Sequence, residues 1–159
     1  MSGIRVENPA TGEVLETFDH VTEQEALAAV DTAHEAFLSW RETPIEERAK
    51  VVTRVAELFE ERKDELAEII ATEMGKPISE GLEEAEFSSA IFGYYADNGP
   101  KFAADEEIPV EMDGKGYIQR LPIGVLLGIM PWNFPYYQVA RFAAPNLMLG
   151  NTIILKLSL

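Results

Sequence analysis

The sequence contains no cysteine among its 159 residues. This absence excludes a disulfide, a thiolate metal site and a cysteine nucleophile within the chain. Long apolar runs are also missing, since no stretch of about 18 uncharged apolar residues occurs, and the opening "MSGIRVENPATGEV" lacks the apolar core of a signal peptide. Neither membrane insertion nor export is therefore indicated, and we expect a cytoplasmic protein.

Basic residues are few as well, because 13 Lys and Arg stand against 28 Asp and Glu, a formal net charge of −15. Such a chain repels polyanions, so nucleic-acid binding is not expected. Most of the acids lie on expected helical segments, where a solvated face is the ordinary interpretation. A salt-rich cytoplasm, as in a halophilic cell, is one setting that suits this surface, because salt screens the self-repulsion.

Histidine is also scarce, with His20 and His34 as the only two in the sequence. Neither has a carboxylate or a cysteine at the spacing of a metal-ligand motif, so we predict no metal site. What the sequence does contain is enough apolar character to form a core, since 47% of its residues are hydrophobic. Its length suits a single folded unit.

The first part of the chain predicts short strands and then helices. "ENPATGEVLETF" contains two extended pieces around Pro9–Gly12, because proline and glycine favour a turn there. Thr22 and Glu25 have the spacing of a capping box, which predicts a helix that runs to about Trp40.

Two further helices are expected before any strong strand signal. An apolar stripe from Val52 to Ile70 predicts one long helix after Pro44, with a stop at the "GKP" of residues 75–77. A third helix is predicted from near Ser79 to the helix breaker "NGP" at residues 98–100.

The second part of the chain changes to strand patterns. "IPVEM" and "YIQRL" flank "DGKG", which predicts a hairpin over Ile108 to Leu121 that must pack on something else. "IGVLLGIM" and "NTIILK" then flank the helical "YYQVARFAAPNLMLG", the pattern of a βαβ unit in a parallel sheet. Gly150 is the expected helix stop, and Pro145 should bend or end that helix early. The predicted fold class is α/β, with N-terminal helices, a hairpin arm and the start of a Rossmann-like sheet.

Polar residues follow both strands of this predicted βαβ unit. In open α/β sheets, ligands bind beyond the carboxyl ends of the strands, so Asn133 and Lys156 should lie at one edge, where a nicotinamide dinucleotide could bind. The glycine-rich dinucleotide fingerprint is missing after either strand, so spacing alone supports such a site only weakly.

Each candidate residue has an ordinary structural alternative. Asn133 is either a helix N-cap or an amide donor to a developing oxyanion, held by its flanking prolines. Trp132 is either a core residue or a platform for a ligand, and Lys156 is either a solvent-reaching strand end or a cation for ribose and phosphate. Arg141, in the helix after the turn, is most simply a surface charge.

The residues around this turn resemble a known family. "GVLLGIMPWNFP", with a lysine in "GNTIILK" placed 23 positions after the asparagine, closely resembles the aldehyde dehydrogenase superfamily. The resemblance extends over nearly the whole chain through "NPATGEV", "EMGKPISE" and "YYADNGPKFAADE". Within that superfamily, "EMGKP" and "YYQVARFAAPNLMLGN" are most similar to succinate-semialdehyde dehydrogenases.

The resemblance implies roles for the candidate residues. Asn133 would donate its side-chain amide to the oxyanion of a thiohemiacetal. Arg141, eight residues later, would bind the substrate carboxylate, a task that suits a guanidinium. Lys156 would hold the adenosine ribose or its phosphate, and the remaining cofactor-binding residues would be Ile129, Met130, Pro131, Trp132 and Ser158.

The resemblance also implies a reaction and a division of the chain. In this family a cysteine thiolate attacks the aldehyde, a hydride passes to NAD or NADP, and a glutamate activates the hydrolytic water. The nucleophile, the base and the pyrophosphate-binding glycines would lie beyond the position that matches Leu159. Leu159 itself stands where many NAD-preferring members carry a ribose-binding glutamate, which leaves NAD and NADP both open.

The expected organisation follows from these matches. Residues 1–107 would be the helical part of the cofactor-binding domain, 108–121 part of an oligomerisation arm of a dimer or tetramer, and 122–159 the first βαβ of the dinucleotide-binding sheet. The ending suggests a truncation or frameshift of a longer enzyme that oxidises succinate semialdehyde. The alternative is a non-catalytic fragment that acts only as a folding or association module.

Overall fold

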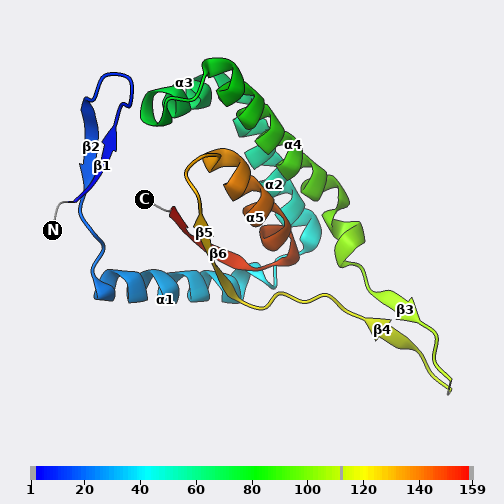
Figure 1. The fold of residues 1–159 in the computed structure, drawn as a ribbon. Helices are drawn as coiled ribbons and strands as arrows, with labels where there is room; N and C mark the ends of the chain where they lie inside the picture. The colour runs from blue at the N-terminus through cyan, green and yellow to red at the C-terminus, as the bar shows by residue number, and fades with distance from the viewer. Residues whose placement is uncertain (1–2, 112, 158–159) are drawn as a thin grey trace.

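The computed structural model describes residues 3–111 and 113–157 and has the predicted α/β character (Figure 1). Helices dominate the first two thirds, and a parallel strand pair with a crossover helix follows. The elements in chain order are β1 (Ile4–Glu7), β2 (Val14–Phe18), α1 (Glu23–Trp40), α2 (Ile45–Glu61), α3 (Lys63–Met74), α4 (Ile78–Ala103), β3 (Glu106–Ile108), β4 (Gly116–Ile118), β5 (Val125–Met130), α5 (Pro135–Leu149) and β6 (Thr152–Leu157).

The N-terminal predictions are confirmed. β1 and β2 pair antiparallel, and Gly12 takes a positive φ of 74° in the turn between them. α1 begins with the predicted capping box, because the Thr22 side chain accepts from the Glu25 amide while the Glu25 carboxylate accepts from the Thr22 amide. These reciprocal bonds satisfy amides that a helix start otherwise leaves without partners.

The prediction of one long helix after Pro44 is wrong, because the chain forms α2 and α3 with a break at Arg62. Arg62 has φ −110° and ψ 13°, outside the helical range, and its guanidinium binds both carboxylate oxygens of Glu65 in the first turn of α3. Both helices still bury an apolar face, so the break leaves the hydrophobic periodicity almost intact. The predicted stop at Gly75 is confirmed, since Gly75 ends α3 in the left-handed conformation.

The helix breaker predicted at residues 98–100 is also wrong, because α4 continues through Pro100 to Ala103. Proline removes only one helical hydrogen bond, and here it does so one turn before the helix ends. Packing compensates for that loss. Gly99 is buried against Met148 of α5, where an added Cβ would lie 2.6 Å from the Met148 Cε.

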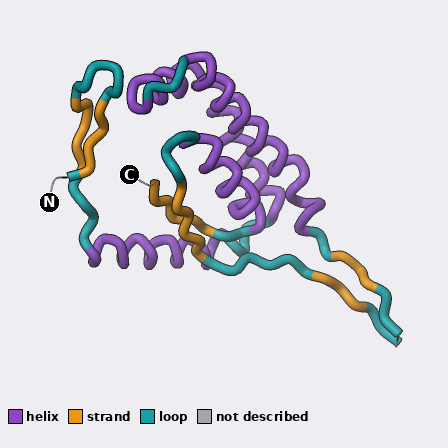
Figure 2. Tube along the Cα trace, in the orientation of Figure 1, coloured by secondary structure: helices purple, strands orange, loops and turns teal. Residues whose placement is uncertain are grey.

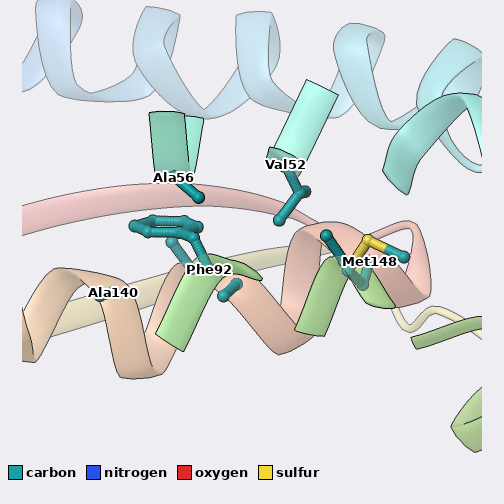
Figure 3. Packing of buried hydrophobic residues seen from close by; sticks show 8 residues of the cluster. Val52, Ala56, Phe92, Ala140 and Met148 are labelled. Carbon is teal, nitrogen blue, oxygen red and sulfur yellow. The ribbon is translucent and has the colours of Figure 1, made fainter. Parts of the chain in front are cut away.

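The hydrophobic core lies where α2, α4 and α5 meet (Figure 3). α5 brings small side chains to this contact, so its backbone can approach the neighbouring helices closely. Pro145 lies within α5. Of the two effects predicted for it, a bend or an early end, the early end is wrong, because α5 runs to Leu149. The buried cluster consists of Val52, Ala56, Phe92, Ala96, Ala140, Ala143, Ala144 and Met148.

The predicted βαβ unit is confirmed, since β5 and β6 pair in parallel with α5 as the crossover. Gly128 faces α5 at close range, because a Cβ there would lie 2.7 Å from the Phe142 ring. Gly150 ends α5 in the left-handed conformation, as predicted. The buried Asn151 side chain then accepts hydrogen bonds from the amides of Ile123 and Gly124, which joins the starts of the two strands.

The hairpin projects away from the helices (Figures 1 and 2). Its strands are shorter than predicted and begin earlier, because β3 and β4 pair only from Glu106 opposite Ile118 to Ile108 opposite Gly116. Within the described residues, none of the helices combines the length and the apolar character needed to span a membrane.

Candidate functional site

The carboxyl ends of β5 and β6 meet at one edge of the sheet, as the sequence predicts. In the parallel register, Ile129 lies opposite Lys156 and Met130 opposite Leu157. The "PWNFP" turn follows β5 directly and leads into α5, so Asn133 leaves this same edge. The side chains of Asn133 and Lys156 are both exposed.

The interpretation of Asn133 as a helix N-cap is wrong. The N-cap residue of α5 is Phe134, with φ −143° and ψ 70°, and among the described residues no side chain of the turn caps the helix. The first amides of α5 bind elsewhere. Glu84 of α4 accepts hydrogen bonds at its Oε1 from the amides of Tyr136 (2.9 Å) and Tyr137 (3.1 Å). The Asn133 carboxamide is therefore not occupied in starting the helix.

Glu84 and Lys76 form a buried ion pair behind the turn, and only 1% and 5% of their side chains are exposed. The Lys76 ammonium also lies 3.7 Å from the centroid of the Phe134 ring, in cation–π contact. Neither residue is among those that the sequence patterns predict for the site. The sequence contains one indication of a role for Glu84, because this acid lies on the stripe of α4 whose other residues are small or apolar and buried.

A pocket of about 530 Å³ lies beside the turn, between α4 and the first turn of α5. Its walls are aromatic, since the ring of Tyr137 stacks on Phe87 at 5.5 Å and meets Phe134 edge-on at 6.2 Å. Carboxylates line the side formed by α4. The lining residues are Glu80, Glu83, Glu84, Phe87, Phe134 and Tyr137.

Arg141 lies one helical turn beyond Tyr137 and is exposed. Its guanidinium carbon is 5.6 Å from the centroid of the Tyr137 ring. The structure therefore brings a cation next to the Tyr137 ring, which is one of the aromatic walls of the pocket. A guanidinium in this place can bind an anionic group that the glutamates repel.

Tyr136 has a structural role rather than an acid–base role. Burial, together with the nearby carboxylates of Glu73 and Glu84, raises the pKa of Tyr136 to about 12. Its hydroxyl donates a hydrogen bond to the Leu66 carbonyl at 3.1 Å. At neutral pH the phenol therefore stays protonated and ties α5 to α3.

The residues proposed for the cofactor lie along the end of β5 and β6. Ile129 and Pro131 are exposed, and Met130 and Trp132 are half-buried. The Lys156 ammonium donates to the Leu157 carbonyl at 3.0 Å and otherwise reaches solvent. Ser158 and Leu159 lie outside the described residues. In the part of the chain that the structure covers, no three histidine, aspartate or glutamate side chains come together in an arrangement that could hold a metal ion.

Sequence comparisons find similar proteins along the whole chain. The sequence model described as "Aldehyde dehydrogenase family" matches residues 1–159. A succinate-semialdehyde dehydrogenase (NADP+) of Deinococcus radiodurans is 46% identical over 149 residues, which are 94% of this chain and 31% of that protein. A probable succinate-semialdehyde dehydrogenase (NADP+) of Synechocystis sp. is 40% identical over 149 residues, 94% of this chain and 33% of that protein.

Solved structures agree with these sequence matches. The succinic semialdehyde dehydrogenase of Streptococcus pyogenes in complex with NADP+ has a TM-score of 0.92 at 35% identity, covering 97% of this chain and 34% of that one. An aldehyde dehydrogenase of Brucella melitensis biovar abortus has a TM-score of 0.91 at 31% identity, covering 97% of this chain and 32% of that one. The chain thus spans about a third of the length of these similar proteins.

Proposed function

The chain belongs to the aldehyde dehydrogenase family, and on that premise we propose that it carries the oxyanion-binding turn and part of the cofactor site of a cytoplasmic enzyme that oxidises succinate semialdehyde to the carboxylic acid. The observation that carries this proposal is that Glu84, and not Asn133, accepts hydrogen bonds from the first amides of α5. Because Glu84 binds the first helix amides, the exposed Asn133 carboxamide is available to a ligand at the sheet edge.

In this proposal Asn133 donates its amide hydrogen to the carbonyl oxygen of the aldehyde as negative charge develops there. A rigid donor stabilises that charge without reorganising, and the prolines at 131 and 135 restrict the backbone on both sides of the asparagine. The rigid turn and the exposed amide at one sheet edge support this role.

The cofactor proposal is NADP+ or NAD+, with NADP+ favoured by the names of the relatives. The residues present fit such a group, since Ile129 and Met130 offer apolar contact and the exposed Lys156 offers a cation for a phosphate or a ribose. Pro131, Trp132 and Ser158 complete the proposed set. When bound, the nicotinamide accepts the hydride of the aldehyde.

Arg141 is proposed to bind the substrate carboxylate. Its exposed guanidinium beside Tyr137 could form two parallel hydrogen bonds to a carboxylate, while Glu80 and Glu83 in the pocket lining would repel that anion. The glutamates and the arginine together would orient the succinate semialdehyde with its carboxylate toward α5.

The proposed organisation assigns residues 1–107 to the helical part of the cofactor-binding domain, 108–121 to an oligomerisation arm and 122–159 to the first βαβ of the dinucleotide-binding sheet. The chain has no cysteine, so a thiolate nucleophile must come from residues outside it. The same absence favours a second proposal for the chain on its own, namely a non-catalytic folding or association module.

One experiment tests both proposals. Residues 1–159 replace the corresponding third of the Deinococcus radiodurans relative, which gives a protein that we call the fused protein. We expect the fused protein to form NADPH, measured by absorbance, from succinate semialdehyde and NADP+, and the 159-residue chain alone to form none. A folded fused protein without turnover on any aldehyde would remove the enzymatic proposal, and turnover by the chain alone would remove the non-catalytic one.

A further inference from the structure

The ion pair between Lys76 and Glu84 is buried, and removing two charges from water is costly. A buried pair is retained at low cost only where further hydrogen bonds satisfy its remaining atoms. Here both side chains have additional partners, and those that the structure describes belong to the segment that follows Asn133.

Glu84 reaches the start of α5. Its Oε2 binds the Lys76 ammonium, while its Oε1 accepts from the amides of Tyr136 and Tyr137. A helix start leaves its first amides without partners and carries partial positive charge, so a carboxylate there stabilises the helix. The carboxylate comes from α4 rather than from the turn itself, so α4 sets the position at which α5 begins.

Lys76 holds the other side of the turn. It follows Gly75, which ends α3, and its backbone is restricted because Pro77 comes directly after it. Its ammonium contacts Glu84 and the face of the Phe134 ring. The pair therefore fixes Phe134, Tyr136 and Tyr137, the residues that follow Asn133 within one helical turn.

We propose that Glu84, held by Lys76, is a positioning residue that sets where the Asn133 carboxamide points. This inference rests on the proposed oxyanion role of Asn133. Only 1% of the Glu84 side chain is exposed and both of its carboxylate oxygens are bound, so its effect on the reaction passes through the turn. A displacement of about 1 Å at a reacting group can lower a rate about 10²-fold, so the loss of this support should appear in kcat.

The test uses Glu84→Gln in the fused protein. The glutamine oxygen can still accept from the two amides, but its NH2 group then faces the Lys76 ammonium, donor against donor. We expect kcat to fall about 10- to 100-fold while the KM for NADP+ changes less than about threefold, because β5 and Lys156 are not touched. Adding Lys76→Met removes the donor clash and should restore part of kcat.

A double-mutant cycle separates positioning from general stability. In an Asn133→Ala background, Glu84→Gln should lower kcat by less than about twofold, because the group that it positions is gone. Equal losses in both backgrounds would overturn the positioning role. The matched control is Glu86→Gln on the same helix as Glu84, which loses the ion pair of Glu86 with Lys63 of α3 and should leave kcat within about twofold of the unsubstituted value.

Amide exchange tests the contact without any substrate. In the 159-residue chain, hydrogen exchange at the Tyr136 and Tyr137 amides should be at least about tenfold faster in Lys76→Met/Glu84→Leu, which removes both charges together and leaves no acceptor. Unchanged exchange would overturn the positioning role by itself. No turnover in the unsubstituted fused protein would instead remove the proposed function, and with it the catalytic meaning of Glu84.

Discussion

At the scale of single residues, the side chain that accepts from the first amides of α5 is not the polar side chain of the turn before the helix. An asparagine before a helix usually accepts from the helix amides, and here Glu84 does so from another helix. Asn133 is thereby left exposed between two prolines. A buried acid on one helix thus leaves a polar residue on the turn available for chemistry.

Arg141→Ala in the fused protein should raise the KM for succinate semialdehyde about 10- to 100-fold, because a charge-assisted pair with the carboxylate is lost. The KM for propanal, which has no carboxylate, should change less than about threefold. Initial rates with both aldehydes measure the difference. Arg141→Lys keeps the charge but not the planar guanidinium, so its KM for succinate semialdehyde should lie between those of the unsubstituted fused protein and Arg141→Ala. An equal loss with propanal would contradict the carboxylate role.

At the scale of single elements, α1 depends on its first turn. Thr22→Ala removes one half of the capping box and should lower the free energy of unfolding of the chain by about 1 kcal/mol in urea denaturation. The matched control is Thr32→Ala in the same helix. Thr32 donates only to the Ala28 carbonyl of its own helix, so that change should be close to neutral. Equal losses from both substitutions would contradict the capping role.

The other half of the capping box gives a pH dependence. The hydrogen bonds that Glu25 accepts from the Thr22 amide and then from the Thr22 hydroxyl lower the pKa of Glu25. A lowered pKa in the folded state adds stability above the ordinary pKa, and this stability is lost as pH falls through the lowered value. The unfolding midpoint of Glu25→Gln should therefore lie below that of the unsubstituted chain at pH 7 and converge with it as pH falls below the ordinary pKa of a glutamate and through the lowered pKa of Glu25. A constant difference would contradict this.

The sequence predicts most elements because local signals are strong there. Gly75 and Gly150 end helices in the left-handed conformation, and the Thr22 capping box begins one, each as the residue types suggest. The predictions at Arg62 and Pro100 are wrong for opposite reasons. The break at Arg62 leaves the apolar periodicity intact, while the breaking effect of Pro100 is outweighed by the packing of Gly99 on Met148.

The sequence predicts those residues of the candidate site that lie at a strand end or in the turn, because a local pattern marks each of them. Asn133 and Lys156 follow from the two strand ends, and their common edge is confirmed by the parallel register. The support of the turn by Glu84 and Lys76 joins α4 to α5 across more than 50 residues of sequence, with sequence separations of 52 and 53 residues in its two amide bonds. A local sequence pattern cannot indicate a contact between residues so far apart in the chain. The one sequence feature that pointed to it was an acid, Glu84, within the stripe of small and apolar residues on α4.

At the scale of the whole molecule, charge should control stability. The 28 acids outnumber the 13 bases, which gives a formal net charge of −15, and the repulsion among the acids opposes folding. Raising KCl from about 0.05 M to about 1 M should raise the melting temperature by about 3–5 °C, because screening weakens repulsion over the whole surface. The exposed ion pairs, each of small value, offset only part of this gain.

The control for the salt effect is a variant with fewer acids. Replacing three exposed acids by Asp31→Asn, Glu35→Gln and Glu68→Gln should make the rise in melting temperature with KCl smaller. A melting temperature that stays constant or falls with KCl in the unsubstituted chain would contradict the conclusion that repulsion among the surface acids outweighs the attraction within the ion pairs.

The most direct test of the oxyanion role is kcat of Asn133→Ala in the fused protein. The removal of one oxyanion donor lowers kcat about 10²- to 10³-fold. The predicted result is a loss of that size with an unchanged KM for NADP+, while Asn98→Ala, whose amide donates to the Tyr94 carbonyl on α4, keeps its activity. A kcat of Asn133→Ala within about threefold of the unsubstituted value would contradict the role of this carboxamide.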